Sequence, residues 1–290
     1  MKGRNDGLLY VGPATVFLFF VLFVPLAYVV YTSFWTADGP SLSAYRRLFG
    51  SALFLRTLWS TFEISISAAV ASMLLGYPIA MHLARQTPRK RAVYMVLVLV
   101  PFWTSILVKS YAFTVLLGRD GLVNQALSAL FHTQVQLPML FNRFGVIVGM
   151  TNYLIPFIVF PVLASLLAID RSLYLASEIA GAKPPRIFFQ ITLPLSLPGV
   201  VAAGLSTTVM SMGFFVIPAL LGGRKDAMMS NLVDFYTREA LDWNMASAIG
   251  VILLGIVTLA ALGADWFQKR DRRRALAAPA STTTKEGAFA

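Results

Sequence analysis

The chain of 290 residues offers few side chains for covalent or metal chemistry. It contains no cysteine and two histidines, His82 and His132. A thiol nucleophile, a disulfide and a thiolate metal site are therefore excluded. Neither histidine belongs to a G-x-S-x-G pattern, which would indicate a serine hydrolase. The functional candidates that remain are isolated charges and aromatic rings within apolar sequence.

The sequence also lacks a loop that could bind the phosphates of ATP. Such a loop has the pattern G-x-x-x-x-G-K-[ST], whose backbone amides surround the phosphates. The nearest stretch, GGRKDAM at 222–228, has glycines and a lysine at the wrong spacing. We therefore predict that the chain is not an enzyme and holds no cofactor and no metal. Energy for any work on a solute must enter from a partner chain or an ion gradient.

Composition identifies the solvent as a lipid bilayer. Hydrophobic residues make up 57% and charged residues only 13% of the chain, whereas a soluble domain has about a quarter charged residues. About 20 helical residues cross the hydrocarbon core, and apolar runs in lipid must be helices. We predict an all-α membrane protein with six spans and a first span that is retained as an anchor. The spans are Leu8–Trp35, Thr57–Met81, Ala92–Gly118, Phe144–Ile169, Leu197–Gly222 and Asn244–Phe267.

Basic residues near the span ends predict the orientation. They are in excess on the side that holds both termini, with RKR at 89–91 and KRDRRR at 269–274, so both termini are expected in the cytoplasm. The formal charge of +11 could indicate nucleic acid, but the cations lack interleaved aromatic rings. Membrane lipids with anionic headgroups are the predicted partner instead, and no nucleic acid. Residues 1–274 are expected to form the membrane domain and 275–290 a disordered cytoplasmic tail.

An interrupted segment at about 170–194 joins the fourth and fifth spans. Asp170 can cap a short helix, Gly181 can end it in the left-handed conformation, and Pro184 with Pro185 can open a second helix. The first helix would align Leu173, Ala176, Ile179 and Ala180 on one face. This elbow either inserts its apolar face into the groove of a partner or packs on the chain's own cytoplasmic surface.

The spacing A-x(4)-G-A followed by I-x-L-P resembles the EAA loop of binding-protein-dependent ABC importer permeases. The matching residues are Ala176, Gly181, Ala182, Ile191, Leu193 and Pro194. The resemblance implies that the elbow is a coupling helix, which sits in a cleft of an ATPase subunit. Leu175 stands where the family usually has Glu, and Glu178 lies one turn further on. The implied coupling residues are Leu173, Leu175, Ala176, Ser177, Glu178, Gly181, Ala182, Pro184 and Pro185.

Longer stretches resemble the spermidine/putrescine-type subfamily. They include VPFWTSILVKSYAFTVLLGRDGLVNQAL at 100–127 and NYLIPFIVFPVLASL at 152–166. The resemblance implies a bacterial inner-membrane subunit that works with two ABC ATPase subunits, a second permease as a heterodimer and an external solute-binding protein. ATP and magnesium would bind the partner subunits, and the solute would be a polyamine or similar organic cation. The alternatives are another small solute, anionic or zwitterionic, and a gradient-driven secondary transporter.

Two charges inside apolar sequence are candidates for the solute pathway. Each costs about 2.5–3.5 kcal/mol at a helix centre on insertion scales, so each calls for a reason. Glu63 could attract a cationic solute, or pair with a cation or hydroxyl on a neighbouring helix. Lys109 could pair with Glu63 or extend to the membrane surface, or face the pathway and favour an anion.

Aromatic and amide side chains complete the set of pathway candidates. They could stack on or hydrogen-bond a solute, or simply pack between helices. The candidates of this kind are Trp103, Tyr111, Asn152 and Tyr153. Prolines inside spans four and five also predict that these spans form the pathway walls, because irregular backbone at membrane depth usually lines a cavity.

Overall fold

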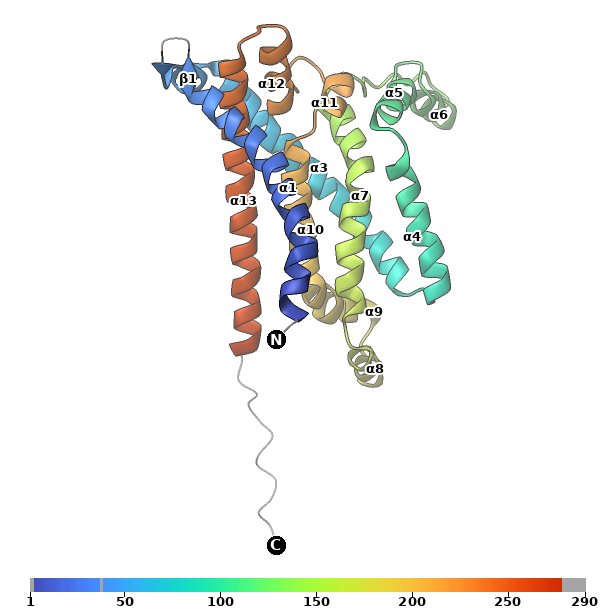
Figure 1. Cartoon of the computed structure of the whole chain (residues 1–290). Helices are drawn as coiled ribbons and strands as arrows, with labels where there is room; N and C mark the ends of the chain where they lie inside the picture. Colours follow the sequence, from blue (N-terminus) through green and yellow to red (C-terminus); the bar gives the residue numbers. More distant parts are fainter. Residues whose placement is uncertain (1–2, 37–38, 278–290) are drawn as a thin grey trace. The chain divides into compact units, whose positions relative to one another are not determined.

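The computed structural model describes residues 3–36 and 39–277, with the side chains of residues 12–36 and 39–263. Helices dominate the chain (Figure 1). The first elements are α1 (Gly3–Phe34), the two-residue strands β1 (Trp35–Thr36) and β2 (Gly39–Pro40), α2 (Ser43–Gly50), α3 (Ala52–Ala84), α4 (Pro88–Trp103), α5 (Ile106–Leu117) and α6 (Leu122–Phe131). The remaining elements are α7 (Arg143–Leu167), α8 (Arg171–Ile179), α9 (Pro184–Ile187), the π-helical segment η1 (Phe188–Thr192), α10 (Leu193–Met212), α11 (Val216–Leu221), α12 (Met229–Arg238) and α13 (Trp243–Ala277).

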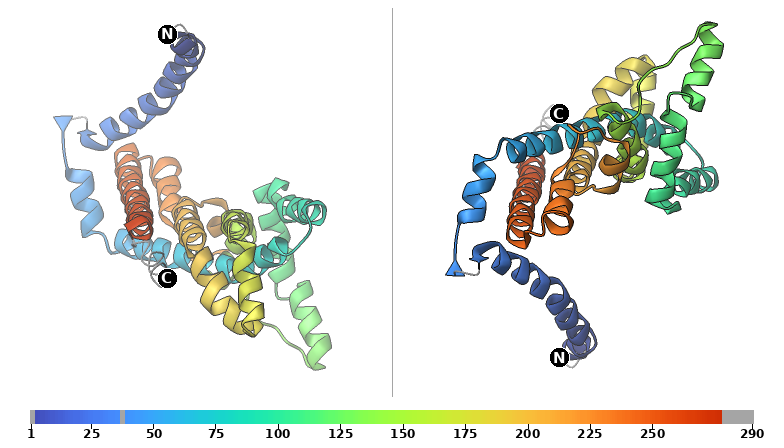
Figure 2. Two further views of the ribbon diagram at one scale, coloured as in Figure 1. Left: turned by 90° about the horizontal axis from the view of Figure 1, so that it is seen from below. Right: turned by 90° about the horizontal axis from the view of Figure 1, so that it is seen from above.

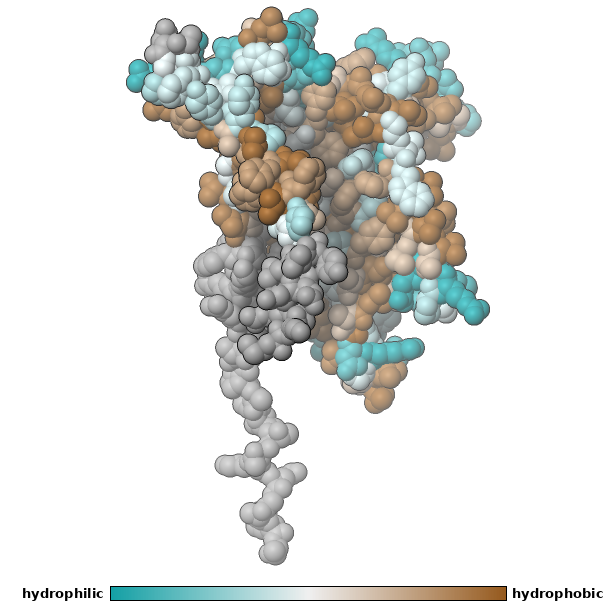
Figure 3. Space-filling model, in the orientation of Figure 1, coloured by the Kyte–Doolittle hydropathy of each residue, from teal (hydrophilic) through white to brown (hydrophobic). Residues whose placement is uncertain are grey.

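Five described helical segments are long and apolar enough to cross a membrane, and a bent pair of helices makes a sixth if it counts as one span. The all-α membrane architecture is therefore confirmed. The five segments are Gly12–Phe34, Ala52–Ala84, Arg143–Leu167, Pro184–Met212 and Trp243–Gly263. Hydrophobic side chains cover most of the visible helical surface (Figure 3), as expected for helices that face lipid or other apolar partners.

The prediction of the third span as one continuous helix is wrong. The chain bends by 88° between Pro88–Trp103 and Ile106–Phe131. Ser105 has φ −51° and ψ 133°, which is not helical, and it precedes the first residue of α5. Pro101 lies in the last turn of α4 and weakens helical hydrogen bonding there. Because Thr104 and Ser105 interrupt an otherwise apolar run for only two residues, hydropathy did not reveal the break.

The fifth span also differs from the prediction at both ends. It starts at the elbow, because α9, η1 and α10 follow one another without a gap from Pro184 to Met212. It ends before Gly222, and the short helix α11 follows separately after residues 213–215. Helix α13 continues to Ala277, three residues beyond the predicted end of the membrane domain at residue 274, and residues 278–290 lie outside the described residues.

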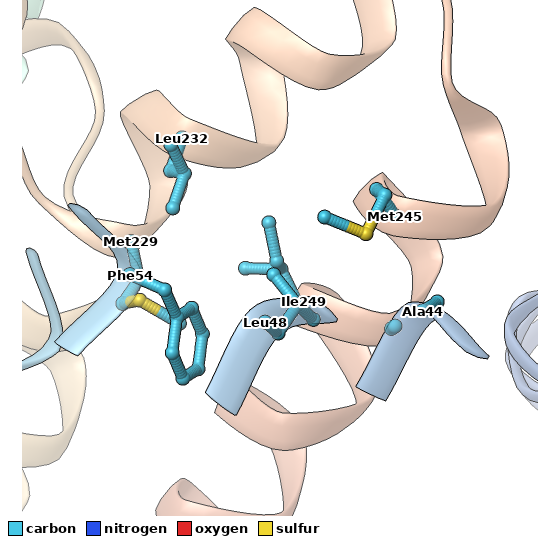
Figure 4. Packing of buried hydrophobic residues seen from close by; sticks show 8 residues of the cluster. Ala44, Leu48, Phe54, Met229, Leu232, Met245 and Ile249 are labelled. Atoms are coloured by element: carbon cyan, nitrogen blue, oxygen red, sulfur yellow. The ribbon is translucent and has the colours of Figure 1, made fainter. Parts of the chain in front are cut away.

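The chain divides into two compact units, and the first comprises the described parts of Met1–Ala68, Thr104–Met150 and Ser211–Ile256. Its core forms where α2, the start of α3, α12 and the start of α13 meet (Figure 4). Helix α12 lies beside α13 in both views of Figure 2. The buried residues of this core are Ala44, Leu48, Phe54, Met229, Leu232, Met245, Ala248 and Ile249. Ala44 and Leu48, four residues apart, share the buried face of α2, so this short helix is held by packing.

The second unit comprises Ala69–Trp103, Thr151–Met210 and the described part of Val257–Ala290. Its buried core joins residues of α3, α7 and α10: Ala80, Leu83, Ile158, Val159, Val162, Leu163, Leu166 and Ala203. Glycines allow these helices to approach closely. A Cβ at Gly76 would lie 2.8 Å from Ile158 Cγ2, and one at Gly199 would lie 2.1 Å from Ser165 Oγ. Small residues at such crossings are typical of helices packed in membranes.

Candidate functional site

A charged cluster in the first unit is built from Glu63, Arg143 and Asp226. Arg143 Nη1 forms an ion pair with Glu63 Oε1, and Arg143 Nε donates to Asp226 Oδ1 at 3.2 Å. The Asp226 side chain is only 10% exposed, whereas those of Arg143 and Glu63 are 34% and 42% exposed. One guanidinium thus serves two carboxylates, and the three groups carry a net charge of −1. We call these three residues the charged junction.

The position of Arg143 is electrostatically unusual. It is the first residue of α7, where the helix macrodipole presents its positive end and disfavours a cation. Asn142 precedes it, and the Asn142 Oδ1 accepts from Gly145 N at 3.0 Å as a helix cap does. The carboxylates of Glu63 and Asp226 therefore offset the unfavourable interaction between the Arg143 cation and the positive end of the α7 dipole.

The loop Gly222–Met228 is fastened to α3 beside the charged junction. Ser60 Oγ donates to Lys225 O at 3.3 Å, and Met229 N donates to Thr61 Oγ1 at 2.9 Å. Asp226 also accepts from Gly223 N at 3.2 Å, which closes the turn inside the loop. A Cβ at Gly223 would lie 2.5 Å from Phe141 O, so the loop passes close to the chain that leads into α7. The loop is fixed by α3, by Arg143 and by its own turn.

Sequence reasoning identified Glu63 but missed both of its companions. The ion pair with Arg143 is the kind of neighbouring-helix contact that the structural alternative for Glu63 required. Arg143 and Asp226 lie outside the apolar runs, so hydropathy gave them no weight. A signal did exist, because an arginine at the start of a predicted span opposes the helix dipole and needs anions nearby. Glu63 lies 80 residues before Arg143 and Asp226 lies 83 residues after it, so sequence spacing could not identify these two partners.

The other pathway candidates divide between the two units. Lys109 is half-buried on α5 in the first unit, and Tyr111 on the same helix is exposed. Trp103 in the second unit is exposed at the end of α4, whereas Asn152 and Tyr153 on α7 are half-buried. Together with Glu63, the candidates are therefore divided between the units: Glu63, Lys109 and Tyr111 belong to the first unit, and Trp103, Asn152 and Tyr153 belong to the second.

Tyr153 belongs to an aromatic cluster in the second unit. Its ring stacks on Phe157, with centroids 5.9 Å apart, and lies 5.5 Å from the ring of Phe102. The rings of Phe102 and Phe157 meet edge to face at 5.4 Å. These separations are the usual ones for aromatic packing, so Tyr153 connects α4 and α7 whatever else it contacts.

The elbow has the predicted helix start and stop signals. Asp170 Oδ1 accepts from Ser172 N at 2.9 Å, and this backbone hydrogen bond lowers the pKa of the Asp170 carboxyl. Gly181 has φ +74°, Gly181 N donates to Glu178 O, and Ala182 N donates to Ser177 O. Those two bonds make a Schellman motif, which ends α8. Pro184 and Pro185 then open α9, where missing amide hydrogens cost nothing.

The elbow leaves large apolar side chains uncovered. Ile179 is 88% exposed, and Leu175, four residues earlier on the same face, is 54% exposed. Hydrophobic and hydrophilic residues lie side by side on the surface of α8 in Figure 3. Leu173 is also exposed, whereas Ser177 and Ala182 are half-buried. The exposed apolar side chains of α8 and its C-terminal cap therefore include Leu175 beside the predicted Leu173, Ala176, Ile179 and Ala180.

The base of the elbow is anchored within the second unit. Tyr174 Oη lies 3.3 Å from Thr192 Oγ1, which ties α8 to η1. Tyr77 on α3 meets Phe188 edge to face at 6.0 Å, and its hydroxyl lies 2.9 Å from Ser196 Oγ on α10. The π-helical segment, a form frequent at functional sites, lies between these contacts. One side of the elbow is therefore fixed to the helices while the apolar face remains open.

Among the residues that the structure describes, no three His, Cys, Asp or Glu side chains gather as a metal site would require. In the charged junction, the carboxylates of Glu63 and Asp226 already bind the guanidinium of Arg143. The arrangement thus offers an ionic cluster and an apolar docking face.

Residues 72–274 match the model of a family described as binding-protein-dependent transport system inner membrane component. The spermidine/putrescine transport system permease protein PotB of Haemophilus influenzae is 30% identical over 272 residues, which cover 90% of this chain and 93% of the relative. PotB of Escherichia coli K12 is 30% identical over 248 residues, covering 82% and 90%. A solved bacterial alginate ABC transporter, in complex with an alginate-bound periplasmic protein, shares the fold: the TM-score is 0.70 at 20% identity, covering 92% of this chain and 96% of that one.

Proposed function

Because this chain belongs to the family of binding-protein-dependent transport system inner membrane components, we propose that it imports a polyamine-type organic cation as one half of a solute pathway. Members of this family are permease subunits of ABC importers and catalyse no reaction themselves. A gradient-driven mechanism does not fit a binding-protein-dependent family. Residues 1–274 would act as one permease domain, followed by the tail at 275–290.

The observation that carries the proposed substrate class is the similarity to two spermidine/putrescine permeases over most of both chains. The likeness to the alginate transporter supports the fold alone, since the identity is 20%. Glu63 is the leading candidate to meet the solute, and Trp103, Lys109, Tyr111, Asn152 and Tyr153 remain pathway candidates.

The elbow is the proposed site of coupling to an ATPase subunit. A helix that exposes Leu175 and Ile179 needs a groove to cover them, and α8 is short, capped at both ends and anchored at its base. Closure of the ATPase pair would then push α8, and the anchored segment behind it would carry the movement into α10 and α3. Glu178 lies on this helix and is exposed, so it is available to a partner in place of the family's usual Glu at position 175.

The complete importer would contain two ATPase subunits, a second permease and an external solute-binding protein. ATP and magnesium would bind the ATPase subunits. The elbow and both termini would lie in the cytoplasm of a bacterium, as the distribution of basic residues predicts. Labelling of a cysteine introduced at Ile179, compared with one at the exposed Trp243, tests this orientation. Only the first should require a membrane-permeant reagent when intact spheroplasts are labelled.

Initial-rate uptake of labelled spermidine and putrescine, in cells with and without this gene, tests the proposed substrate class. We expect saturable uptake that is lost with the gene and blocked by unlabelled polyamines, but not by amino acids or organic anions. Uptake that does not depend on the gene would contradict it. Competition by zwitterions or anions instead would leave the importer architecture in place and assign it another solute.

A further inference from the structure

The turn between α3 and α4 carries exposed cations that no described carboxylate neutralises. The sequence has no acidic residue in the range 64–119. In the second unit, the described side chains include only two carboxylates, Asp170 and Glu178, and both belong to the elbow, which carries three basic residues of its own. Three basic residues of the turn are exposed and form no ion pair with a residue that the structure describes: Arg85, Arg89 and Lys90.

Arg91, the next residue along the chain, is used inside the turn instead. Its Nε donates to Leu83 O at 3.0 Å, and its Nη2 donates to Ala84 O at 3.1 Å and to Gln86 O at 2.9 Å. These carbonyls lie at the end of α3 and just after it, where a helix leaves carbonyl groups unpaired and its dipole favours a cation. Arg91 therefore fixes the backbone from which the other three cations project.

Helix α4 has one face against the core of the second unit and another face that is uncovered. On the first face, Tyr94, Met95 and Val98 are partly buried against that core. The uncovered face consists of apolar residues spaced three and four apart, so they share one side of the helix. We call these residues the α4 stripe, and each is at least half exposed: Val93, Val96, Leu97 and Val100.

Two of the cations lie on the same side of α4 as the α4 stripe. Arg89 precedes Val93 by four residues and Lys90 precedes it by three, and both spacings share a helix face. Helical side chains lean toward the start of their helix, so the two cations extend beyond the end of the stripe. Arg91 precedes Tyr94 by three residues and belongs to the inward face. Figure 3 shows hydrophilic residues at the α3–α4 turn directly below the hydrophobic surface of α4.

We propose that the α3–α4 turn and the α4 stripe together form a binding site for an anionic phospholipid. Arg85, Arg89 and Lys90 bind the phosphate of the headgroup, and the acyl chains lie along the α4 stripe. Basic residues at a membrane surface attract anionic lipids in this way. Because α4 belongs to a candidate membrane span, lipid chains reach its uncovered face without any further protein partner. The site does not depend on which solute the protein carries.

Lipid titration of the purified protein tests this site. The protein is isolated in mild detergent through a tag on this chain, with the subunits that it retains, and is washed free of loosely bound lipid. Native mass spectrometry then measures the binding of anionic dioleoyl phosphatidylglycerol and of zwitterionic dioleoyl phosphatidylcholine, with glycerol phosphate as a soluble competitor. The triple variant combines Arg85→Gln, Arg89→Gln and Lys90→Gln. The matched control removes the same charge from exposed positions of the first unit and combines Arg46→Gln, Arg47→Gln and Arg56→Gln.

The wild type should bind phosphatidylglycerol at least about tenfold more tightly than phosphatidylcholine, because the chains are identical and only the headgroup charge differs. Added salt should weaken this preference, since it screens exposed charges. The triple variant should lose the preference, whereas the control should keep it. A variant with Arg85→Lys and Arg89→Lys retains the charge and should also keep it. Glycerol phosphate at the concentration of the lipid should displace none, because it cannot cover the α4 stripe.

Several results would overturn the inference, and none of them bears on polyamine uptake. No preference for phosphatidylglycerol in the wild type would exclude the site, and an equal loss in the triple variant and the control would indicate attraction by total charge alone. Displacement of the lipid by glycerol phosphate would indicate a site for a soluble anion. Loss of a partner subunit from the triple variant, with lipid binding unchanged, would assign the turn to that subunit. If the triple variant does not assemble, the lysine variant and the salt dependence of the wild type decide.

Discussion

The charged junction and the elbow differ in whether the chain itself satisfies their side chains. In the junction, a guanidinium and two carboxylates satisfy one another, and Ser60 and Thr61 fasten the adjacent loop. In the elbow, backbone groups are satisfied by a cap and a Schellman motif, but Leu175 and Ile179 face outward without cover. A region complete in itself is suited to meet a transient solute, whereas a region with uncovered apolar side chains is suited to a lasting protein partner.

Removal of the Arg143 cation should have the largest effect on the stability of the protein. Arg143→Ala leaves two carboxylates facing each other, of which Asp226 is nearly buried, and we expect a loss of about 2–3 kcal/mol in the free energy of unfolding. Thermal unfolding in mild detergent measures it. The exposed pair Asp234–Arg238 provides the control, because Asp234→Ala should cost under about 0.5 kcal/mol. Equal costs at the two places would contradict the description of the junction as a structural unit.

A substitution at the turn of the elbow should separate stability from coupling. Gly181 has φ +74°, and a Cβ there meets no atom within 4 Å, so Gly181→Val suffers backbone strain of about 1–2 kcal/mol without a steric clash. We expect normal amounts in the membrane but loss of the co-purifying ATPase subunit. Gly181→Asn, which tolerates the left-handed conformation, is the matched variant and should retain the ATPase. Identical ATPase recovery from the Val and wild-type proteins would argue against the elbow as the docking element.

The anchor behind the elbow is expected to have a smaller effect. Tyr77→Phe removes the hydroxyl that lies 2.9 Å from Ser196 Oγ but keeps the ring against Phe188. The expected loss is about 1 kcal/mol in the free energy of unfolding. Tyr174→Phe, whose hydroxyl lies at 3.3 Å from Thr192 Oγ1, should cost less and serves as the comparison. If transport falls while ATP hydrolysis continues in the Tyr77 variant, the anchor transmits the movement; if both rates stay at the wild-type level, it does not.

The smallest expected effect concerns pH at the start of α8. The folded protein lowers the pKa of Asp170 below its ordinary value of 3.8, so the capping bond contributes fully above pH 3.8 and is lost as pH falls through the lower folded value. Protease cleavage within α8 should therefore increase only in acid. Asp170→Asn keeps the cap without titrating, and its cleavage should not change over the same range. A wild-type profile identical to that of the Asn variant would show that the cap does not depend on the carboxylate charge.

Local signals predicted the helix ends within residues 170–185, because each of these signals acts within a few residues. The structure has the expected cap at Asp170, the left-handed backbone at Gly181 and the start of a helix at Pro184 and Pro185. The unbroken continuation of α9 into α10 was not predicted, since the fifth span was expected to begin at Leu197. Pro194 and Pro198 both lie within the first turns of α10. The π-helical segment before them shows that the local backbone adjusts to keep the helix continuous.

The junction was predicted only in part, because its contacts join distant segments. Glu63 was identified by the cost of a carboxylate in apolar sequence, but its partner depends on how α3 and α7 pack. The break at Thr104 and Ser105 was hidden for a related reason: an apolar run predicts burial in lipid, and says nothing about direction. Tertiary packing therefore decided both features.

Cross-linking through one introduced cysteine tests the central claim that the elbow carries the ATPase. The chain has no cysteine, so Ile179→Cys creates a unique thiol at an elbow position that is 88% exposed, and Trp59→Cys on α3 creates one at a position that is 72% exposed. Membranes that contain the complete importer are treated with a short thiol-to-amine cross-linker. We predict a product that joins this chain to the ATPase subunit from Ile179→Cys and none from Trp59→Cys. The absence of that product from Ile179→Cys, with the importer assembled and active, would contradict the account.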